Sequence, residues 1–352
     1  MNSKNKTTES SKANSVSTAR LTSVLADAFK STFSKLLLVG SPGVGKTALV
    51  VSAWKQICES IGGDPEVIVE NISTAAPEDL RGLPHIVDGA AKFSPLTFIR
   101  KLTTATKPTL CFLDDLGCAP TSVQAALLHV IHGGHTEAGR ISPHIRFIGA
   151  TNDRTHRAGV GGIIAPLAGR FTTILNVSPD PETWSLWALG DGIPAEVVSA
   201  VRFRPELFNS EEVPAGITKF ACPRSWEHAG RLVASGAKGL ELLTGTLGEE
   251  AGLFLHGFLG VFATLAGLPE KVLLDPKGAP VPDKYEQRWA LAGALVSKAS
   301  PSTFPQISTY SERLGPELEA FTTKGAITKD PSITTSKDFI KWSITRGKEV
   351  LG

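Results

Sequence analysis

The first half of the chain alternates short apolar runs with stretches that are apolar at helical spacing. The runs, which we interpret as buried strands, are Lys35–Val39, Glu66–Glu70, Thr109–Leu113, Arg146–Ala150 and Thr172–Val177. Helical spacing precedes the first run at Leu21–Phe33 and follows it at Thr47–Ile61. Strands that alternate with helices predict a parallel sheet covered on both faces, which is a three-layer αβα core.

The second half has a different pattern. From about Pro181 onward, helical periods are separated by Pro and Gly, and only Lys271–Leu274 is ambiguous between helix and strand. We predict an all-helical lid domain at residues 182–300 and a C-terminal extension at residues 301–352. The extension begins with a Ser-, Thr-, Pro- and Gly-rich segment, Pro301–Asp338, which predicts loose packing before a last helix.

Two further segments bear on where the protein acts. Residues 1–18 are polar and lack the apolar stretch of a secretory signal, so we expect a disordered tail ahead of a core at residues 19–181. Gly252–Leu268 is apolar, but it includes His256, Thr264 and four glycines, which favours a buried helix over a membrane span. We therefore predict no membrane association.

Composition narrows the class of protein. Of the 352 residues, 41% are hydrophobic and 20% are charged, which is typical of a folded soluble chain. The formal net charge of +2 gives no global basic field, so nucleic acid is not favoured as the main partner. The four cysteines form no C-x-x-C pair, which indicates a reducing compartment and a cytoplasmic location.

A phosphate-binding motif follows the first predicted strand. Its residues are Gly40, Ser41, Pro42, Gly43, Val44, Gly45, Lys46 and Thr47, and they match G-x-x-x-x-G-K-[ST] between a strand and a helix. The glycines let successive N–H groups face one anion, and the helix adds its positive end. We expect Lys46 to contact the β- and γ-phosphates of ATP and Thr47 to bind Mg²⁺. The alternative is a glycine-rich turn without a ligand.

Hydrolysis also needs a carboxylate near the metal and a group that orients water. Asp114 and Asp115 end the predicted strand Thr109–Leu113, where an open parallel sheet places its ligand site. We assign Asp114 to the metal shell and Asp115 as the water-orienting base. The alternative for this pair is to cap the helix that follows.

Three further side chains are candidates for catalysis. Asn152 ends the predicted strand Arg146–Ala150 and would help to position water, although a plain turn residue is the alternative. Arg170 and Arg224 stand beside predicted helix ends, and arginine is suited to spread phosphate charge. Taken singly, either arginine would be a surface ion-pair partner.

Taken in order, these elements resemble the AAA+ ATPase superfamily over about two-thirds of the chain. The resemblance reads GSPGVGKT as Walker A, LCFLDD as Walker B, GATN as sensor 1, LAGRF as the arginine-finger region and CPRSW as sensor 2. It implies Asn152 as sensor 1, Arg170 as a finger that reaches a neighbouring subunit's nucleotide, and Arg224 as the lid sensor. It also implies a homo-oligomeric ring, usually of six. Arg154 and Arg157 are alternatives for the finger.

The segment Ala76–Pro95 adds detail to this resemblance. Two apolar pieces flank Asp88-Gly89 there in the manner of a β-hairpin, and an insertion at this place looks like the MoxR branch. Gly133–His144 is a candidate for a second hairpin of that branch. MoxR-type ATPases typically remodel protein partners, often ones with a von Willebrand factor A domain. Asp115 departs from the usual Glu, which predicts slow hydrolysis.

Several other functions remain as alternatives. A DNA-handling AAA+ machine, such as a clamp loader, helicase loader or phage replication factor, would need a basic surface interleaved with aromatics, and none is conspicuous. A small-molecule kinase would not need the later arginines. A nucleotide-switched scaffold with little hydrolysis is compatible with Asp115. His129, His132 and His135 recur every three residues, but Gly133-Gly134 should end the helix between them, so we interpret them as helix-end residues and not as a metal site.

Overall fold

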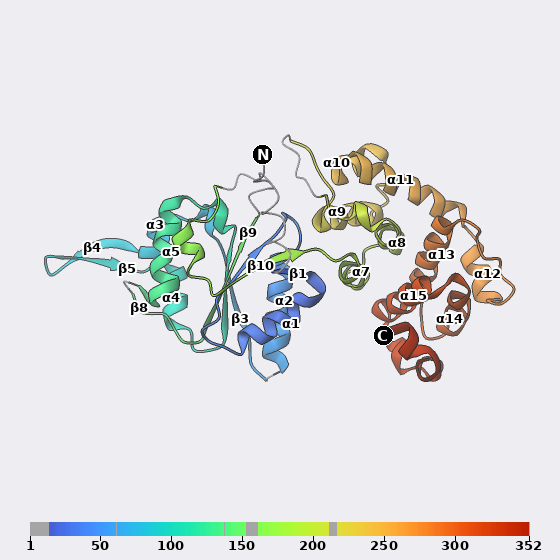
Figure 1. Cartoon of the computed structure of the whole chain (residues 1–352), viewed down its shortest axis with the longest axis horizontal. Coiled ribbons are helices and arrows are strands. Elements are labelled where there is room, and N and C mark those ends of the chain that lie inside the picture. The colour runs from blue at the N-terminus through green and yellow to red at the C-terminus, as the bar shows by residue number, and fades with distance from the viewer. Residues whose placement is uncertain (1–13, 61, 137, 153–160, 211–216, 352) are drawn as a thin grey trace, which may run out of the picture. The chain divides into compact units, whose positions relative to one another are not determined.

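The computed structural model describes residues 14–60, 62–136, 138–152, 161–210 and 217–351. The chain divides into two compact units, Met1–Pro179 and Asp180–Gly352, and each is described by itself. Figure 1 shows strands and helices together in the first unit and helices alone in the second. The predicted fold class, a parallel-sheet core followed by a helical part, is confirmed.

The first unit is built on a six-stranded sheet with the order β1-β10-β2-β9-β6-β3, in which every neighbouring pair is parallel. The strands are β1 (Ser15–Ser17), β2 (Leu36–Val39), β3 (Glu66–Asn71), β6 (Thr109–Asp114), β9 (Ile145–Thr151) and β10 (Thr173–Ser178). Each predicted strand is present within about two residues of its expected bounds. Most of the predicted tail lies outside the described residues, but its end is ordered, because Ser15–Ser17 pairs with β10.

Helices cover both faces of this sheet because its central strands are apolar on both sides. Leu36 and Leu38 pack on one face with α1 (Thr18–Phe29) and α2 (Lys46–Ser60). Leu37 points to the other face, since successive side chains of a strand alternate. The helices on that second face are α3 (Pro77–Arg81), α4 (Thr97–Thr104) and α5 (Thr121–Gly133), and α6 (Ala165–Ala168) follows them in the chain.

Two hairpins interrupt the alternation of strands and helices. The predicted first hairpin is present as β4 (Leu83–Val87) paired antiparallel with β5 (Ala90–Ser94), and it extends away from the sheet (Figure 1). Its turn places Asp88 and Gly89 at φ of 52° and 75°, and positive φ at both positions is what a tight two-residue hairpin turn requires. A shorter hairpin, β7 (His135–Thr136) with β8 (Gly139–Arg140), lies within the second candidate segment.

Among its described residues, the second unit contains helices joined by loops and turns, and no strand. Its helices are α7 (Pro181–Gly190), α8 (Ala195–Phe203), α9 (Pro223–Ala234), α10 (Leu240–Leu247), α11 (Glu249–Thr264), α12 (Leu268–Leu274), α13 (Tyr285–Ser297), α14 (Phe304–Ser311), α15 (Pro316–Lys329), α16 (Lys337–Trp342) and α17 (Lys348–Leu351). The ambiguous run Lys271–Leu274 is therefore helical. One hydrophobic core runs through the unit, from Trp184 to Val350.

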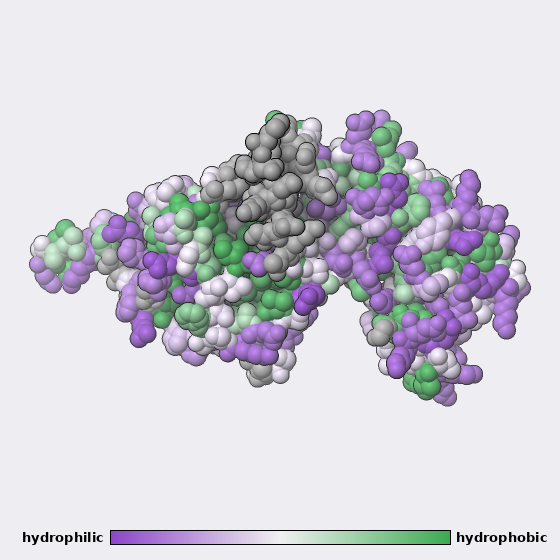
Figure 2. Space-filling model, viewed as in Figure 1, coloured by the Kyte–Doolittle hydropathy of each residue, from purple (hydrophilic) through white to green (hydrophobic). Residues whose placement is uncertain are grey.

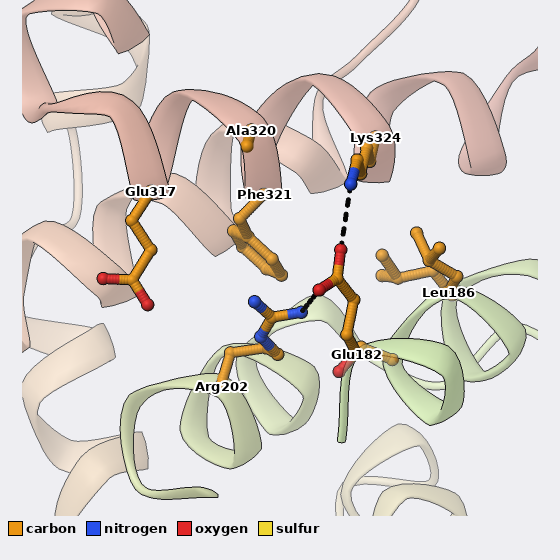
Figure 3. A pocket seen from close by; sticks show the side chains of 9 residues that line it. Glu182, Leu186, Arg202, Glu317, Ala320, Phe321 and Lys324 are labelled. Carbon is orange, nitrogen blue, oxygen red and sulfur yellow. Dashed lines mark hydrogen bonds and ion pairs between the residues drawn. The ribbon is translucent and has the colours of Figure 1, made fainter. Parts of the chain in front are cut away.

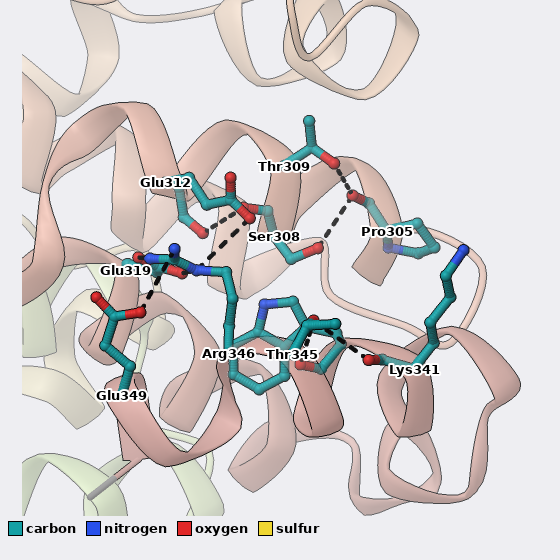
Figure 4. Close-up of polar contacts among 11 residues, drawn as sticks. Pro305, Ser308, Thr309, Glu312, Glu319, Lys341, Thr345, Arg346 and Glu349 are labelled. Carbon is teal, nitrogen blue, oxygen red and sulfur yellow. Dashed lines mark hydrogen bonds and ion pairs between the residues drawn. The ribbon is translucent and has the colours of Figure 1, made fainter.

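The segment Pro301–Asp338 differs from its prediction. It is not loosely packed, because α14 and α15 bury Phe304, Tyr310 and Phe321 in the core of the helical unit. Its hydroxyl side chains bond to the backbone of their own helices, as Ser308 and Thr309 do to the carbonyl of Pro305 (Figure 4). Polar residues can therefore occupy these helices without leaving unpaired groups.

The end of the chain is joined to this core by an ion pair. Arg346 lies in a π-helical turn, Ser343–Gly347, between α16 and α17. Its guanidinium binds both carboxylate oxygens of Glu319 at 2.9 and 2.8 Å, while Glu312 and Glu349 lie 3.7 and 3.6 Å away (Figure 4). The Glu319 side chain is only 2% exposed, so this bidentate contact supplies the counter-charge that a buried carboxylate needs.

Among the described helices, none is by itself long and apolar enough to cross a bilayer. The bent pair α11 and α12 meets the length and composition test only when the two are joined across a 49° bend. One face of α11, with Leu255 and Phe258, is buried in the core of the helical unit. The segment Gly252–Leu268 is thus helical but only partly buried, because α11 ends at Thr264 and Leu253 is 49% exposed.

Candidate functional site

The predicted phosphate loop connects the end of β2 to the start of α2. Gly43 and Gly45 have φ of 79° and 89°, a region that side chains other than glycine rarely adopt. The curl that these two residues permit brings the loop directly onto the first turn of α2 at Lys46. Backbone N–H groups at the start of a helix are suited to bind a phosphate.

Lys46 links this loop to the end of another strand. Its side chain is largely buried, and its Nζ donates to the carbonyl oxygens of Gly40 at 2.9 Å and Ser41 at 3.1 Å. The same Nζ donates to Oδ1 of Asn152 at 3.1 Å. Asn152 follows β9, which neighbours β2 in the sheet. The ammonium group is therefore held between the loop and the residue predicted as sensor 1.

Thr47 and Asp114 are also in direct contact. The Thr47 hydroxyl donates to Oδ2 of Asp114 at 2.6 Å, although 67 residues separate the two in sequence. The other oxygen of this carboxylate, Oδ1, accepts the backbone N–H of Asp115 at 2.9 Å. Both carboxylate oxygens are thus fixed in direction. A hydroxyl and a carboxylate side by side are the kind of oxygen donors that Mg²⁺ prefers.

Asp115 has an unusual backbone. It adopts the left-handed conformation, with φ of 53°, at the point where β6 passes into a short 3₁₀ turn, Leu116–Cys118. Asp tolerates this region better than most residues, though at some cost in strain. Its side chain makes no capping hydrogen bond to that turn, so the structure gives no support to the capping alternative. Burial, and then the charges of Asp115 and Asp114, raise the pKa of the nearby Cys118 thiol.

All of these groups lie at one edge of the sheet. Asp114 ends β6 and Asn152 follows β9, and in a parallel sheet the carboxyl ends of neighbouring strands meet at the same edge. The loop leaves the carboxyl end of β2 at that edge as well. The structure therefore brings together Lys46, Thr47, Asp114, Asp115 and Asn152.

Arg170 lies at the opposite edge. It comes three residues before the amino end of β10, and Thr172 pairs there with Lys35, which immediately precedes β2. The backbone N–H of Thr172 donates to the carbonyl of Lys35 at 2.8 Å. Arg170 is consequently separated from its own phosphate loop by the length of β2.

Residues 35–171 match the family model for an AAA domain of the dynein-related subfamily. This segment is an AAA+ domain. It contains every strand of the sheet except β1 and β10, and it includes the loop, Asp114, Asn152 and Arg170. The search of curated proteins found no match.

The chain is also similar to solved structures at low scores. One is the RuvB Holliday junction branch migration motor of Thermotoga maritima, with 15% identity and a TM-score of 0.34 over 79% of this chain and 80% of that one. Another is NtrX from Brucella abortus in complex with ADP, with 14% identity and a TM-score of 0.36 over 95% of this chain and 68% of that one. At these values the likeness supports no statement about activity.

The other predicted arginines are placed differently or not described. Arg224 lies in the first turn of α9 in the helical unit, and its side chain is exposed. Arg154 and Arg157, the alternatives for the finger, lie outside the described residues.

Gln124, which the sequence did not indicate, joins two segments of the AAA+ domain through buried hydrogen bonds. Gln124, on α5, is 2% exposed and donates to the carbonyls of Ala119 at 3.0 Å and Gly162 at 3.1 Å. Its Oε1 accepts the N–H of Ile164 at 2.9 Å. It thereby joins the loop after Asp115 to the segment that leads into α6 and Arg170. No motif marks it, although a lone Gln on the apolar face of a helix is the kind of residue whose burial needs partners.

The helical unit contains a cavity of about 230 Å³ between α7, α8 and α15, and none of the predicted site residues lines it (Figure 3). Glu182 bridges two cations there, Lys324 at 2.9 Å and Arg202 at 3.7 Å. Phe321 and Leu186 supply apolar walls. Because these charges satisfy one another across the three helices, the cluster is explained by packing of the unit.

Proposed function

We propose that this protein is an ATPase, and that it binds ATP with Mg²⁺ at Gly40–Thr47 and hydrolyses it. The observation that carries the proposal is the hydrogen bond between Thr47 and Asp114, because it joins the Walker A and Walker B motifs in one site. The bond from Lys46 to Asn152 adds sensor 1 to the same site. A glycine-rich turn without a ligand would need none of these contacts.

The residues fit distinct roles in hydrolysis. Thr47 and Asp114 would hold Mg²⁺, which would neutralise charge on the phosphates. Lys46 would turn its ammonium from the loop carbonyls toward the β- and γ-phosphates. Asp115, half-buried beside Asp114, would orient the attacking water, with Asn152 as a second water-positioning group. With Asp in place of the usual Glu, we expect slow hydrolysis.

We also propose that the active form is a homo-oligomeric ring, with six subunits as the usual number. Arg170 lies at the edge opposite to its own phosphate loop, so it would serve the nucleotide of a neighbouring chain. Arg224, exposed in the first turn of α9, would report the nucleotide state to the helical unit.

The proposed work of the ring is remodelling of a protein partner in the cytoplasm, as in the MoxR branch. The β4–β5 hairpin supports this, because it carries Pro84, Ile86, Ala91 and Phe93 on one face. Ile86 is 72% exposed on the extended hairpin, whose outer end shows hydrophobic surface in Figure 2. An exposed apolar face suits a protein client better than the phosphates of DNA. A partner with a von Willebrand factor A domain is the first candidate.

The test is ATP hydrolysis measured together with oligomer mass for two complementary variants. Lys46→Ala removes a phosphate contact but keeps Arg170, whereas Arg170→Ala keeps the loop but removes the finger. We expect each variant alone to be inactive and still assembled, and a mixture of the two to recover activity, because mixed rings pair an intact loop with an intact finger.

The opposite results are equally informative. If the mixture stays inactive while both variants assemble, Arg170 does not act in trans. If the unaltered protein and Arg170→Ala hydrolyse ATP equally well as monomers, the ring mechanism is wrong. Tight, salt-dependent binding of duplex DNA would favour the DNA-handling alternative over protein remodelling.

A further inference from the structure

The backbone that carries Arg170 is fixed on both sides. Leu167 and Phe171 are buried in the core of the AAA+ domain, and the N–H of Arg170 donates to the carbonyl of Leu167 at 3.0 Å. Two residues later, the Thr172 hydroxyl donates to the carbonyl of Lys35 and accepts the N–H of Lys35, each at 2.9 Å. Any freedom of the guanidinium therefore belongs to its side chain and not to its backbone.

The side chain of Arg170 reaches the last turn of α5. Its Nη1 lies 3.0 Å from Nδ1 and 3.4 Å from Nε2 of His132. Its Nε is buried and has no hydrogen-bond partner among the described residues. The guanidinium is thus held at one end, through His132, while another donor of the same fork is unused.

A second cation stands beside this contact. Lys35 donates from Nζ to the carbonyl of Ile131, the residue before His132. Burial and the charge of Arg170 both lower the pKa of Lys35, which indicates that the two cations repel each other. An acceptor on the imidazole ring opposes that repulsion, because a neutral histidine presents one ring nitrogen without a proton.

We propose that His132 is the positioning residue for Arg170, and that its neutral ring holds the guanidinium in place for the nucleotide of the neighbouring subunit. This inference rests on the proposed function, since it assumes that Arg170 acts on ATP. His132 lies with Arg170 at the edge away from its own phosphate loop, so it would not contact the nucleotide that its own chain binds. Its loss would therefore change the rate of hydrolysis and leave ATP binding by the same chain intact.

The test compares His132→Ala with His132→Asn. The Asn Oδ1 lies close to where the histidine Nδ1 was and still accepts a hydrogen bond, whereas Ala offers no acceptor. We expect His132→Ala to lower kcat about tenfold, since displacement of a catalytic group by about 1 Å can cost up to a hundredfold. KM for ATP and ring mass should stay unchanged. His132→Asn should restore most of kcat, and His129→Ala, on an exposed position of the same helix, should leave it unaltered.

A double-mutant cycle with Arg170→Lys, which keeps a cation and therefore a measurable residual rate, separates this inference from the proposed function. If His132 acts by holding the guanidinium of Arg170, His132→Ala should cause a smaller loss in Arg170→Lys than in the unaltered protein. The inference is overturned if Arg170→Ala abolishes activity while His132→Ala does not reduce it, or if Asn is as damaging as Ala. If Arg170→Ala itself has no effect, the proposed finger fails, and the role of His132 fails with it.

Discussion

Replacing Gln124 with Met would test whether one buried amide holds the segment that leads to Arg170. Met has a similar length but neither donates nor accepts a strong hydrogen bond. The change removes the bonds to the carbonyls of Ala119 and Gly162 and the bond from the N–H of Ile164. Because Gln124 is 2% exposed, water cannot easily replace the lost partners.

The expected cost follows from these three contacts. A hydrogen bond in a folded protein contributes about 1 kcal/mol net, and a buried group left unpaired costs about 1–3 kcal/mol. Carbonyl oxygens tolerate the loss of a partner better than an N–H does, so the N–H of Ile164 should dominate. We estimate a total of about 3 kcal/mol, which corresponds to local opening about a hundred times more frequent.

Hydrogen exchange followed by mass spectrometry is the suitable assay, because it reads each segment separately. Peptides that cover residues 161–171 should exchange about a hundredfold faster in Gln124→Met, while peptides from α2 change little. Gln56→Met is the matched control, since Gln56 is exposed on α2 in the same unit. The reasoning is refuted if residues 161–171 keep their protection, or if Gln56→Met has the same effect.

Three further predictions concern charge at other places. Asp115→Glu should raise kcat tenfold or more, because the longer side chain advances the carboxylate by about 1.5 Å. Asp115→Asn should lower kcat. If Asp115→Asn released phosphate as fast as the unaltered protein, the assigned role of Asp115 would be contradicted. Because its pKa is raised, the Cys118 thiol is less ionised at pH 8 in the folded protein than in the unfolded chain. Iodoacetamide should therefore modify Cys118 more slowly in the folded protein, and Asp115→Asn should make the reaction faster. Mass spectrometry measures both rates. Arg346→Met should lower the midpoint of urea unfolding of the helical unit, because it leaves the buried Glu319 carboxylate without its partner. Tryptophan fluorescence follows the unfolding. An unchanged midpoint would show that the ion pair does not stabilise the unit.

The sequence predicted the central strands well because they are buried on both faces. Leu36–Val39 and Thr109–Asp114 are continuous apolar runs, and such runs have few alternatives in a chain with helices on either side. It failed at Ser15–Ser17, since a short Ser-Val-Ser strand has no apolar signature. Its place in the sheet depends on backbone pairing with β10, which lies about 160 residues away and is not visible in local pattern.

The residues of the candidate site likewise include some that the sequence indicated and some that it did not. Lys46, Thr47 and Asp114 belong to motifs whose residues have fixed local roles, so the sequence indicated them directly. Gln124 and His132 act through contacts with segments about 40 residues away along the chain, and neither has a local signature. From its spacing, His132 is interpreted as a helix-end residue, and nothing in the sequence indicated its contact with Arg170. Its contact with Arg170 follows from the fold, because α5 returns to the amino edge of the sheet before β9 begins.

The sheet itself sets a constraint on how the two parts of the site can work together. β2 separates its edges by four residues, which is about 13 Å at 3.3 Å per residue. Arg170 is anchored at the amino edge by Thr172 and Lys35, while Thr47 and Asp114 meet at the carboxyl edge. No rotation of side chains brings Arg170 to its own loop through a packed sheet. We therefore predict that any action of Arg170 on nucleotide occurs between chains, so that hydrolysis which depends on this residue should rise with protein concentration over the range in which the chains assemble.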